Sequence, residues 1–380
     1  MDEHCVPVRL EELQSYSLFS KRFVWKKNLG SGSDGIVASY TDMHTKGRIA
    51  VKMPREENTS RINALKEEIS ILHSIGKHDH IVSMLTFCHD FWPIGPAIFF
   101  PVCDLGDLLS YWKHTQGEKV RANVPARFPE VTILKLLADM ISALDYLHNS
   151  HPVSFVHGDL KPENILVCTP PGYTGVHVSH EPIFKITDLG RITIYPTHPG
   201  SLPVPDAWRG TYEYAPPLAE RHGPLKPAID MYSLGATIAF VALGFTPNTS
   251  RARITALAAR AGVRAPPLTD DDAWHEPFWR AQRLVVYRPI CATKKELCDK
   301  WDVDGRHGAV LGAHAPYSQL LNLWYKMLMH EDAETRVSAK HMMKYIKPLV
   351  EMRIGVERVL AKAVDGWNRG SSTRMGRRME

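Results

Sequence analysis

The most informative part of the chain is Val156-His157-Gly158-Asp159-Leu160-Lys161-Pro162-Glu163-Asn164-Ile165-Leu166. It holds a carboxylate, an ammonium group and a carboxamide close together, at Asp159, Lys161 and Asn164. A carboxylate can accept a hydroxyl proton, an ammonium group can neutralise charge on a transferred phosphoryl group, and a carboxamide oxygen can ligate a hard cation. A polar turn between two strands is the simpler interpretation, but it does not require these three side-chain types together.

A second acidic position follows downstream, where a short apolar segment ends in Lys185-Ile186-Thr187-Asp188-Leu189-Gly190. Asp188 could supply another oxygen ligand for Mg²⁺. An Asp before Leu-Gly is also an ordinary turn sequence, so this motif gains its meaning from the one upstream.

Upstream, Gly30-Ser31-Gly32-Ser33-Asp34-Gly35 matches the pattern G-x-G-x-x-G. Gly30, Gly32 and Gly35 would let backbone N–H groups approach phosphate oxygens, because no Cβ stands in the way. A flexible hairpin turn explains an isolated match equally well. A strand-like segment, 36–40, follows the glycines, which disfavours the dinucleotide-binding form of the motif.

Two oppositely charged residues are expected to form an ion pair. Lys52 ends the strand-like segment 49–52, where an isolated lysine is usually a solvated edge residue. Glu68 lies on the apolar face of an expected helix, with Leu65 and Leu72 three and four residues away. Because an unpaired buried charge is very costly, Glu68 needs a cation, and Lys52 is the candidate.

The two halves of the chain differ in their expected secondary structure. Before residue 103, short β-branched and aromatic segments predict strands over 22–26, 36–41, 48–53, 81–87 and 97–102, with one helix from a Ser60 cap to Ile75. Beyond it, apolar spacing predicts a helix over 131–147 and a buried helix over 229–245. A chain of 380 residues exceeds the size of a single core, so we expect two lobes around a crevice.

Together these motifs resemble those of the eukaryotic-type protein kinases, over about residues 22 to 350. The resemblance implies an α+β bilobal fold, with a small, mainly β N-lobe containing one helix and a larger, mainly α C-lobe. The implied organisation is an extension (1–21), the N-lobe (22–102), the C-lobe (103–352) with inserts near 115–129, 168–182 and 250–315, and a basic tail (353–380). The tail composition after residue 365 predicts a disordered end.

The resemblance also implies ATP and Mg²⁺ as cofactors. The nucleotide would lie under the glycines and against Lys52 and its partner Glu68, with the adenine ring among Val37, Ala50, Phe100, Cys103, Leu108 and Leu166. Asn164 and Asp188 would hold the metal ion. Catalysis would involve Asp159 as base, Lys161, Asn164, Asp188 and Thr211, whose hydroxyl would bridge Asp159 and Lys161. An apolar spine of Leu72, Met84, His157 and Leu189 would link the lobes, with Asp230 anchoring His157.

Three positions depart from the family pattern. Gly158 stands where most such kinases carry an Arg that binds a phosphorylated activation loop, so we expect that Thr193, Thr197 and Ser201 are not required for switching. Leu189 replaces a Phe of similar volume, with little expected effect. Pro217 replaces a Glu, which leaves Arg336 without its usual mate and Glu213 or Glu220 as substitutes.

Three functions fit these motifs. The context of Lys161 favours transfer of the ATP γ-phosphoryl group to Ser or Thr of a protein, and the stretch Gly210-Thr211-Tyr212-Glu213-Tyr214-Ala215-Pro216 resembles a peptide-docking segment. The H-G-D sequence also resembles small-molecule kinases of the aminoglycoside and choline type. A pseudokinase scaffold that binds nucleotide without turnover is the third possibility, although every residue type that the chemistry needs is present.

Composition limits the environment and the partners. The excess of 46 Lys and Arg over 41 Asp and Glu is too small to predict nucleic-acid or membrane binding. The six cysteines form no C-x-x-C pair, and the chain starts without a secretory pattern, so we expect an intracellular protein, in the cytoplasm or nucleus. No apolar stretch is long enough to span a bilayer. The sequence does not indicate an oligomeric state.

Overall fold

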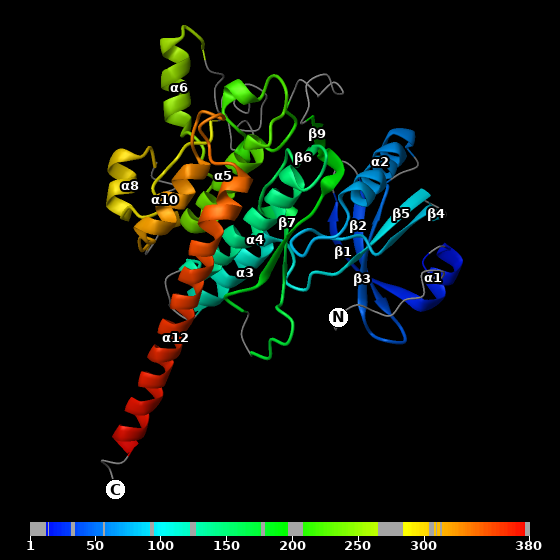
Figure 1. The fold of residues 1–380 in the computed structure, drawn as a ribbon, viewed down its shortest axis with the longest axis horizontal. Coiled ribbons are helices and arrows are strands. Elements are labelled where there is room, and N and C mark those ends of the chain that lie inside the picture. Colours follow the sequence, from blue (N-terminus) through cyan, green and yellow to red (C-terminus); the bar gives the residue numbers. More distant parts are fainter. Residues whose placement is uncertain are drawn as a thin grey trace.

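The chain forms the expected two lobes, with a β-rich N-terminal part and a helical C-terminal part (Figure 1). The computed structural model describes residues 13, 15–31, 35–55, 58–91, 95–121, 127–175, 179–196, 208–264, 284–303, 308, 310–311 and 314–376. Side chains are described for most of these, except those of 31, 118–121, 361 and 364–376. The predicted α+β bilobal fold is confirmed.

A five-stranded antiparallel sheet forms the N-lobe, in the order β1-β2-β3-β5-β4. Its strands are β1 (Phe23–Ser31), β2 (Ile36–Asp42), β3 (Arg48–Met53), β4 (Thr86–Phe91) and β5 (Gly95–Pro101). Lys52 on β3 is paired with Val37 on β2 and with Ile98 on β5. This register puts the lysine in the middle of the sheet.

The helix α1 (Tyr16–Arg22) packs on this sheet from the segment that precedes the expected lobe boundary. The Phe19 ring stacks on Phe23 at 4.8 Å and meets Phe91 edge-on at 5.2 Å. Leu13 and Phe19 are both buried in the same cluster as Val51 and Phe99. The hydrophobic core of the N-lobe therefore includes residues before Arg22.

Two expected element boundaries of the N-lobe were wrong. The helix α2 (Thr59–Ile75) is capped by Asn58, whose side chain accepts a hydrogen bond from the backbone N–H of Ser60. The segment expected as a strand over 81–87 becomes a strand only at Thr86. Ile81 instead forms a single bridge to Ile186, which lies in the other lobe and far away in the sequence.

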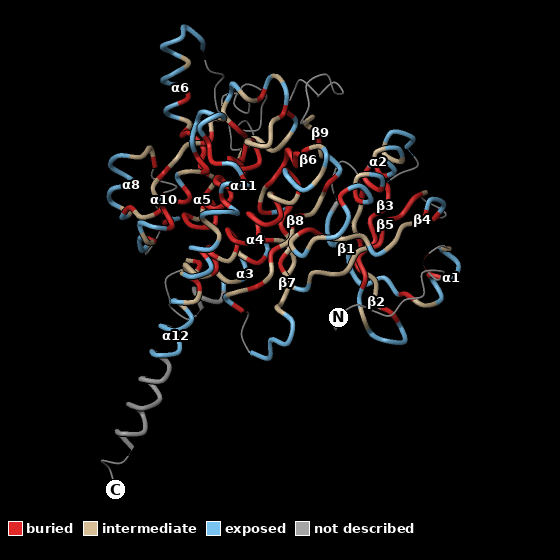
Figure 2. The backbone as a smooth tube through the Cα atoms, in the orientation of Figure 1, coloured by how far each residue is buried: buried red, intermediate tan, exposed pale blue. Residues whose placement is uncertain are grey.

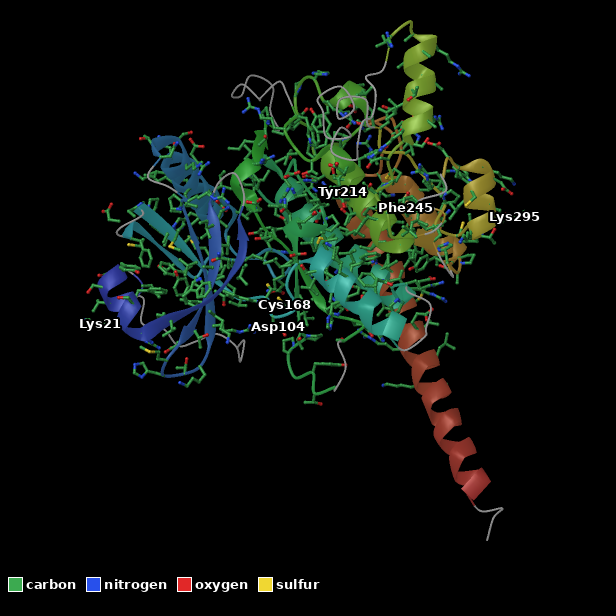
Figure 3. All side chains as sticks on the ribbon, turned by 180° about the vertical axis from the view of Figure 1, so that it is seen from behind. Lys21, Asp104, Cys168, Tyr214, Phe245 and Lys295 are labelled. Atoms are coloured by element: carbon green, nitrogen blue, oxygen red, sulfur yellow. The ribbon has the colours of Figure 1, made fainter. Side chains whose placement is uncertain are left out.

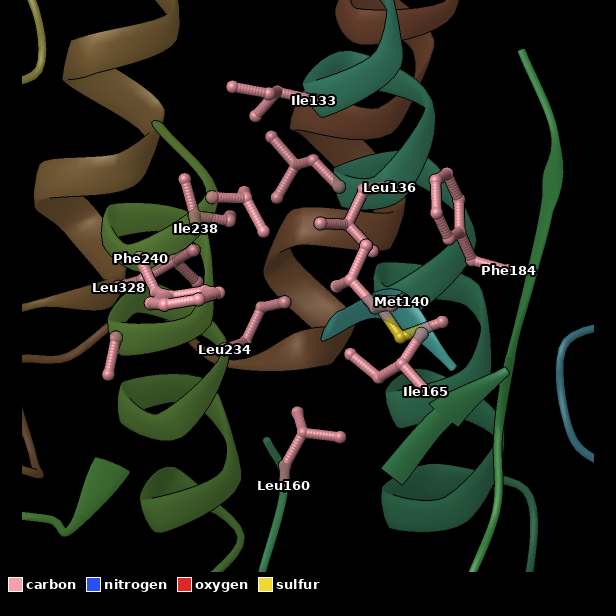
Figure 4. Packing of buried hydrophobic residues seen from close by; sticks show 14 of the residues in the cluster. Ile133, Leu136, Met140, Leu160, Ile165, Phe184, Leu234, Ile238, Phe240 and Leu328 are labelled. Carbon is pink, nitrogen blue, oxygen red and sulfur yellow. The ribbon is translucent and has the colours of Figure 1, made fainter. Parts of the chain in front are cut away.

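The C-lobe is built on α3 (Leu108–Arg121), α4 (Glu130–Asn149) and α5 (Ala228–Leu243). Every residue of α5 from Ile229 to Leu243 is buried, as the apolar sequence predicted. Figure 2 shows this dense buried region in the middle of the lobe. In Figure 4, Leu160 and Ile165 lie between α4 and α5, near Met140 and Leu234. The polar residues between Leu160 and Ile165 are thus held by apolar neighbours on both sides.

Four short strands of the C-lobe form two separate pairs. The strand β6 (Ser154–Val156) pairs with β9 (Thr193–Tyr195), and β7 (Ile165–Cys168) pairs with β8 (Ile183–Ile186). Both pairs are antiparallel. The segment 157–164 therefore lies between β6 and β7, with the segment 187–192 beside it.

The expected surface excursions contain regular structure. The first, 115–129, begins within α3, and the third, 250–315, contains α6 (Arg251–Arg260) and α8 (Lys294–Lys300). The second, 168–182, begins with the last residue of β7, and its other described residues, 169–175 and 179–182, form no helix or strand. Figure 1 shows α6 projecting away from the body.

The C-terminal region differs from the expected disordered end. After α10 (Gln319–Leu328), α11 (Ala339–His341) continues through a π-helical segment (Met342–Ile346) into α12 (Lys347–Gly376). Pro348, which has no N–H to donate, is the second residue after this segment. The helix α12 extends well beyond the body (Figure 1), so the sequence composition was a poor guide here. Among the described helices, none combines the length and the apolar character needed to cross a membrane.

Candidate functional site

Three charged residues from three elements meet at the boundary between the lobes. The Nζ atom of Lys52 on β3 lies 2.8 Å from Oε1 and 2.7 Å from Oε2 of Glu68 on α2. The same Nζ lies 3.1 Å from Oδ1 of Asp188, which follows β8. The structure therefore shows the expected pairing of Lys52 with Glu68 and adds Asp188 to it.

Burial decides the character of this cluster. Lys52 and Glu68 are buried, whereas the Asp188 side chain is 37% exposed. Burial opposes the charged form of Lys52, but the carboxylates of Glu68 and Asp188 outweigh it and raise the pKa of Lys52. For Asp188, burial favours the neutral acid, but the Lys52 charge prevails and lowers the pKa of Asp188. Both shifts favour the charged forms of Lys52 and Asp188, and of the three side chains only that of the aspartate is open to solvent.

A second cluster surrounds Asp159. Its Oδ1 accepts a hydrogen bond of 2.7 Å from the backbone N–H of Thr211, and its Oδ2 lies 3.3 Å from Lys161 Nζ. Lys161 in turn donates to the Thr211 hydroxyl at 2.8 Å. Thr211 thus connects both residues, but it reaches Asp159 through its backbone N–H and not, as expected, through its hydroxyl.

The pairing of β7 with β8 sets the positions of Asn164 and Asp188, the two candidate metal ligands. Because Ile165 is paired with Ile186, Asn164 and Thr187 lie at the same end of this ribbon, and the Thr187 N–H donates to the Asn164 carbonyl oxygen at 3.0 Å. The Asn164 amide nitrogen donates to the Asp159 carbonyl oxygen at 2.8 Å. This bond orients the side-chain oxygen of Asn164 away from that carbonyl. Asp188, the next residue along, has a left-handed backbone, with φ of 61°.

The glycine-rich turn separates β1 from β2. Gly35 is required by close packing, since a Cβ there would lie 2.4 Å from the Met53 carbonyl oxygen. A Cβ on Gly30 would meet no described atom within 4 Å, so packing against the described residues does not explain a glycine at that position. This open space fits a loop that must admit a bound phosphate chain. Gly32 lies outside the described residues.

The residues expected around adenine come from four strands of both lobes and from the connection from β5 to the start of α3. Ala50 on β3 is buried and is paired with Phe100 on β5. Cys103 follows β5, and the half-buried Val37 and Leu166 lie on β2 and β7. Leu166 forms a bridge to Asp107, which precedes the buried Leu108. Strand pairing thus joins Ala50 to Phe100, and the bridge at Leu166 joins β7 to the segment before α3.

The buried Asp230 on α5 organises the segment before Asp159. Its carboxylate accepts hydrogen bonds from the backbone N–H groups of His157 at 2.8 Å and Gly158 at 2.9 Å. His148 Nε2 lies 2.8 Å from the same carboxylate. Burial favours the neutral acid, yet the hydrogen bond to His148 and the other contacts lower the pKa of Asp230. The expected link from Asp230 to His157 is present, and it joins the Asp230 carboxylate to the backbone N–H of His157.

The expected spine residues lie at or beside the main core. Leu72 and Leu189 belong to it, and Met84 packs against it. His157 is fully buried, and its Nε2 lies 3.0 Å from the Thr187 carbonyl oxygen.

Sequence reasoning missed two residues that hold the segment 208–211 near Gly158. The Trp208 indole N–H donates to the Gly158 carbonyl oxygen at 2.9 Å. Arg191 donates to the Arg209 carbonyl oxygen at 2.6 Å and lies 3.8 Å from Asp159. Gly158 has a φ of 76°, a conformation that favours glycine. A tryptophan just before the Gly-Thr-Tyr motif was the available sequence signal.

The end of this segment is anchored by an ion pair between Arg336 and Glu220. The two guanidinium nitrogens lie 2.9 and 2.6 Å from the two carboxylate oxygens. Of the two candidates left open by the sequence, Glu220 is therefore the partner of Arg336. Glu220 lies three residues after Pro217, so Arg336 has a carboxylate partner although position 217 does not supply one.

Comparison with known proteins identifies this arrangement. The family model described as "Protein kinase domain" matches residues 23–346. The chain is 30% identical over 221 residues to mitogen-activated protein kinase kinase kinase 6 of Homo sapiens, covering 58% of this chain and 15% of that protein. It is 28% identical over 251 residues to the serine/threonine-protein kinase ATG1 of Pichia angusta, covering 58% and 29%. The chain thus spans less than a third of these relatives.

Proposed function

Because this chain belongs to the protein kinase domain family, we propose that it transfers the γ-phosphoryl group of ATP to serine or threonine hydroxyls of protein substrates, with Mg²⁺. The observation that carries this proposal is the contact of Lys52 Nζ with both Glu68 and Asp188. It joins β3, α2 and the segment after β8, which are the three elements that must converge for phosphoryl transfer.

The residues around Asp159 support a role in orienting the acceptor. Asp159 would accept the proton of the substrate hydroxyl, while Thr211 and Lys161 hold its carboxylate in place. Lys161 would also lie close to the transferred group and offset its charge. Its hydrogen bond to the Thr211 hydroxyl keeps the ammonium group directed toward this site.

The residues at the end of the β7–β8 ribbon fit a hard divalent cation. The oxygens of Asn164 and Asp188 are the ligand types that Mg²⁺ prefers, and the solvent-exposed Asp188 carboxylate would allow the ion to keep water ligands. When bound, the ion would neutralise charge on phosphate oxygens. The chain's own contribution is to fix both oxygens through the β7–β8 pairing and the Lys52 contact.

A protein substrate is favoured over a small molecule by the anchored activation segment. Residues 208–220 are held by Trp208, Thr211 and the ion pair between Glu220 and Arg336. Such a fixed surface next to Asp159 suits docking of an extended peptide. The relatives include proteins named as serine/threonine kinases, which supports the same acceptor class.

The test compares the wild-type chain with Asp159→Asn and with the matched control Asp299→Asn, whose side chain lies on the exposed face of α8. Each is incubated with Mg²⁺, labelled ATP and a mixed pool of proteins and peptides, and the phosphorylated residues are mapped. Phosphoserine or phosphothreonine made by wild type and Asp299→Asn, but not by Asp159→Asn, supports the proposal. Nucleotide binding without transfer would instead support the scaffold function, and transfer only to aminoglycoside or choline acceptors the small-molecule function.

A further inference from the structure

Two cysteines lie next to each other beside the cleft. Cys103 follows β5, and Cys168 is the last residue of β7. Both side chains are half-buried and therefore reachable by small solutes. Figure 3 shows Cys168 close to Asp104, the neighbour of Cys103 in the chain. The other described cysteines lie elsewhere, Cys88 in the N-lobe sheet and Cys291 and Cys298 near α8.

The backbone around this pair is held together by several hydrogen bonds. The Leu105 N–H donates to the Val167 carbonyl oxygen at 3.2 Å, and the Val167 N–H donates to the Gly106 carbonyl oxygen at 2.8 Å. The Asp104 carboxylate accepts from the Thr169 N–H at 2.9 Å and from the Thr169 hydroxyl at 2.6 Å. Residues next to both cysteines are thus tied together, which fixes the separation of the two Cα atoms.

The two thiols are in direct contact. The Cys103 thiol is hydrogen-bonded to the Cys168 sulfur, and this bond, together with burial, raises the pKa of Cys103. Cys103 therefore keeps its proton and acts as donor, while Cys168 accepts. The positive charge of Lys185 on β8 opposes the rise in the pKa of Cys103 but does not cancel it. Because Cys103 keeps its proton, we assign Cys168 as the attacking cysteine and Cys103 as the resolving one.

We propose that Cys103 and Cys168 form a redox-active dithiol that hydrogen peroxide converts into an intramolecular disulfide. The Cys168 thiolate attacks one peroxide oxygen, the O–O bond breaks, and the products are a sulfenic acid and hydroxide, which takes up the proton released by the thiol to form water. The Cys103 sulfur then attacks the sulfenic sulfur, forming the S–S bond and releasing a second water. In sum, two thiols and one peroxide give one disulfide and two waters.

The disulfide would join the segment after β5 covalently to the end of β7. Under the proposed function, these two segments contribute Cys103 and Leu166 to the adenine site, so the cross-link would form at the edge of the nucleotide site. The dithiol chemistry itself does not depend on phosphoryl transfer. Failure of one proposal is therefore distinguishable from failure of the other.

The experiment maps disulfides in the full chain. The reduced protein is exposed to increasing hydrogen peroxide, free thiols are blocked with N-ethylmaleimide, and the unreduced digest is analysed by mass spectrometry. The expected result is a linked pair of peptides containing Cys103 and Cys168, formed about tenfold faster than Cys298 is oxidised. Separate alkylation of Cys103 and Cys168 at peroxide levels that oxidise Cys298 would overturn the proposal.

Matched variants and a denatured sample complete the test. Cys298→Ser should form the same linked pair, whereas in Cys168→Ser the Cys103 peptide should remain unlinked at the same peroxide dose. In urea, where the contact between the segments is lost, the rate advantage of the pair over Cys298 should disappear. A link from Cys103 to another cysteine in the folded wild type, or an equal rate in urea, would contradict a pair positioned by the fold.

Discussion

The buried guanidinium of Arg336 is neutralised by the carboxylate of Glu220, which stands three residues after Pro217. The Arg336 side chain is fully inaccessible and also donates to the carbonyl oxygens of His330 and Ala228. The activation segment is thereby joined to the loop before α11. Glu220 thus supplies the ion pair with Arg336 that position 217, a proline, does not supply.

Removal of the Glu220 charge should strongly destabilise the fold. Glu220→Gln leaves Arg336 buried without a counter-charge, and we expect a loss of about 3 kcal/mol in the free energy of unfolding. Glu334→Gln is the matched control, because Glu334 pairs with Lys226 on the surface, where a loss below about 1 kcal/mol is expected. Urea denaturation measures both values. Equal losses in the two variants would show that burial of Arg336 does not matter.

The hydroxyl of Thr211 should contribute to turnover through Lys161. Thr211→Val removes the acceptor of the Lys161 hydrogen bond but keeps the backbone N–H that donates to Asp159. A hydrogen bond to a charged group contributes about 1.5–3 kcal/mol, so kcat should fall roughly 10- to 100-fold. Thr211→Ser keeps the hydroxyl and should retain most of the wild-type kcat. If serine and valine lower kcat equally, the hydroxyl has no such role.

Loss of the Asp188 carboxylate should remove most turnover without unfolding the chain. Asp188→Asn leaves Lys52 paired with Glu68, so we expect a melting temperature near that of wild type. With one charged ligand of the proposed metal site lost, kcat should fall by about 10²–10³. Steady-state assays over a range of Mg²⁺ concentrations test this, with Asp299→Asn as control. Near-normal kcat in Asp188→Asn would remove this residue from the metal site.

Activity should not depend on phosphorylation of the activation segment. Gly158 provides no guanidinium for a phosphate, and Trp208 and Arg191 hold the segment through hydrogen bonds that the unmodified chain already makes. The double variant Thr197→Ala, Ser201→Ala, at positions outside the described residues, should retain activity within about threefold, far less than the loss of a charge-assisted contact would cause. Phosphatase treatment of the wild type is the parallel measurement. Loss of activity in either sample, with folding intact, would refute the prediction.

The stability of the N-lobe should depend on acid through Asp42. Burial favours the neutral form of this carboxyl, but Arg22, the His44 N–H and the Thr45 hydroxyl outweigh it and hold the pKa of Asp42 well below its usual value. A lowered folded-state pKa stabilises the fold above the unfolded-state pKa of about 4, and this contribution is lost as the pH falls further. Asp42→Asn should therefore be less stable than wild type at pH 7.

The pH series makes this prediction specific. The difference in unfolding free energy between wild type and Asp42→Asn should be constant from pH 7 to about pH 5 and should shrink below about pH 4. Asp299→Asn should differ little from wild type across the range. A difference that stays constant down to pH 3 would mean that ionisation of Asp42 does not stabilise the N-lobe.

Sequence reasoning succeeded where the information was local or chemical. The apolar stripe around Glu68 predicted a buried carboxylate that needs a cation, and Lys52 lies within 2.8 Å of it. The spacing of apolar residues predicted α4 and α5 nearly to their ends. Both results depend on burial patterns that repeat within one element.

The failures have a common physical origin in contacts between distant residues. Ile81 looked like part of a strand, but its partner is Ile186 in the other lobe. Glu213 and Glu220 were equally plausible partners for Arg336, since only the folded path of the segment decides between them. Asn58 and Ser60 are both good helix caps, and the choice between them depends on the backbone conformation at Asn58.

The carboxylate of Asp230 has a consequence for the timescale on which the site can move. It binds the amides of His157 and Gly158 from within α5, whose residues from Ile229 to Leu243 are all buried, between α4 and the rest of the C-lobe. Those amides can exchange their hydrogens with water only when this part of the core opens. We therefore expect Asp159 to be carried by a slowly opening unit of the chain, so that under the proposed function substrate entry depends on motions of other segments.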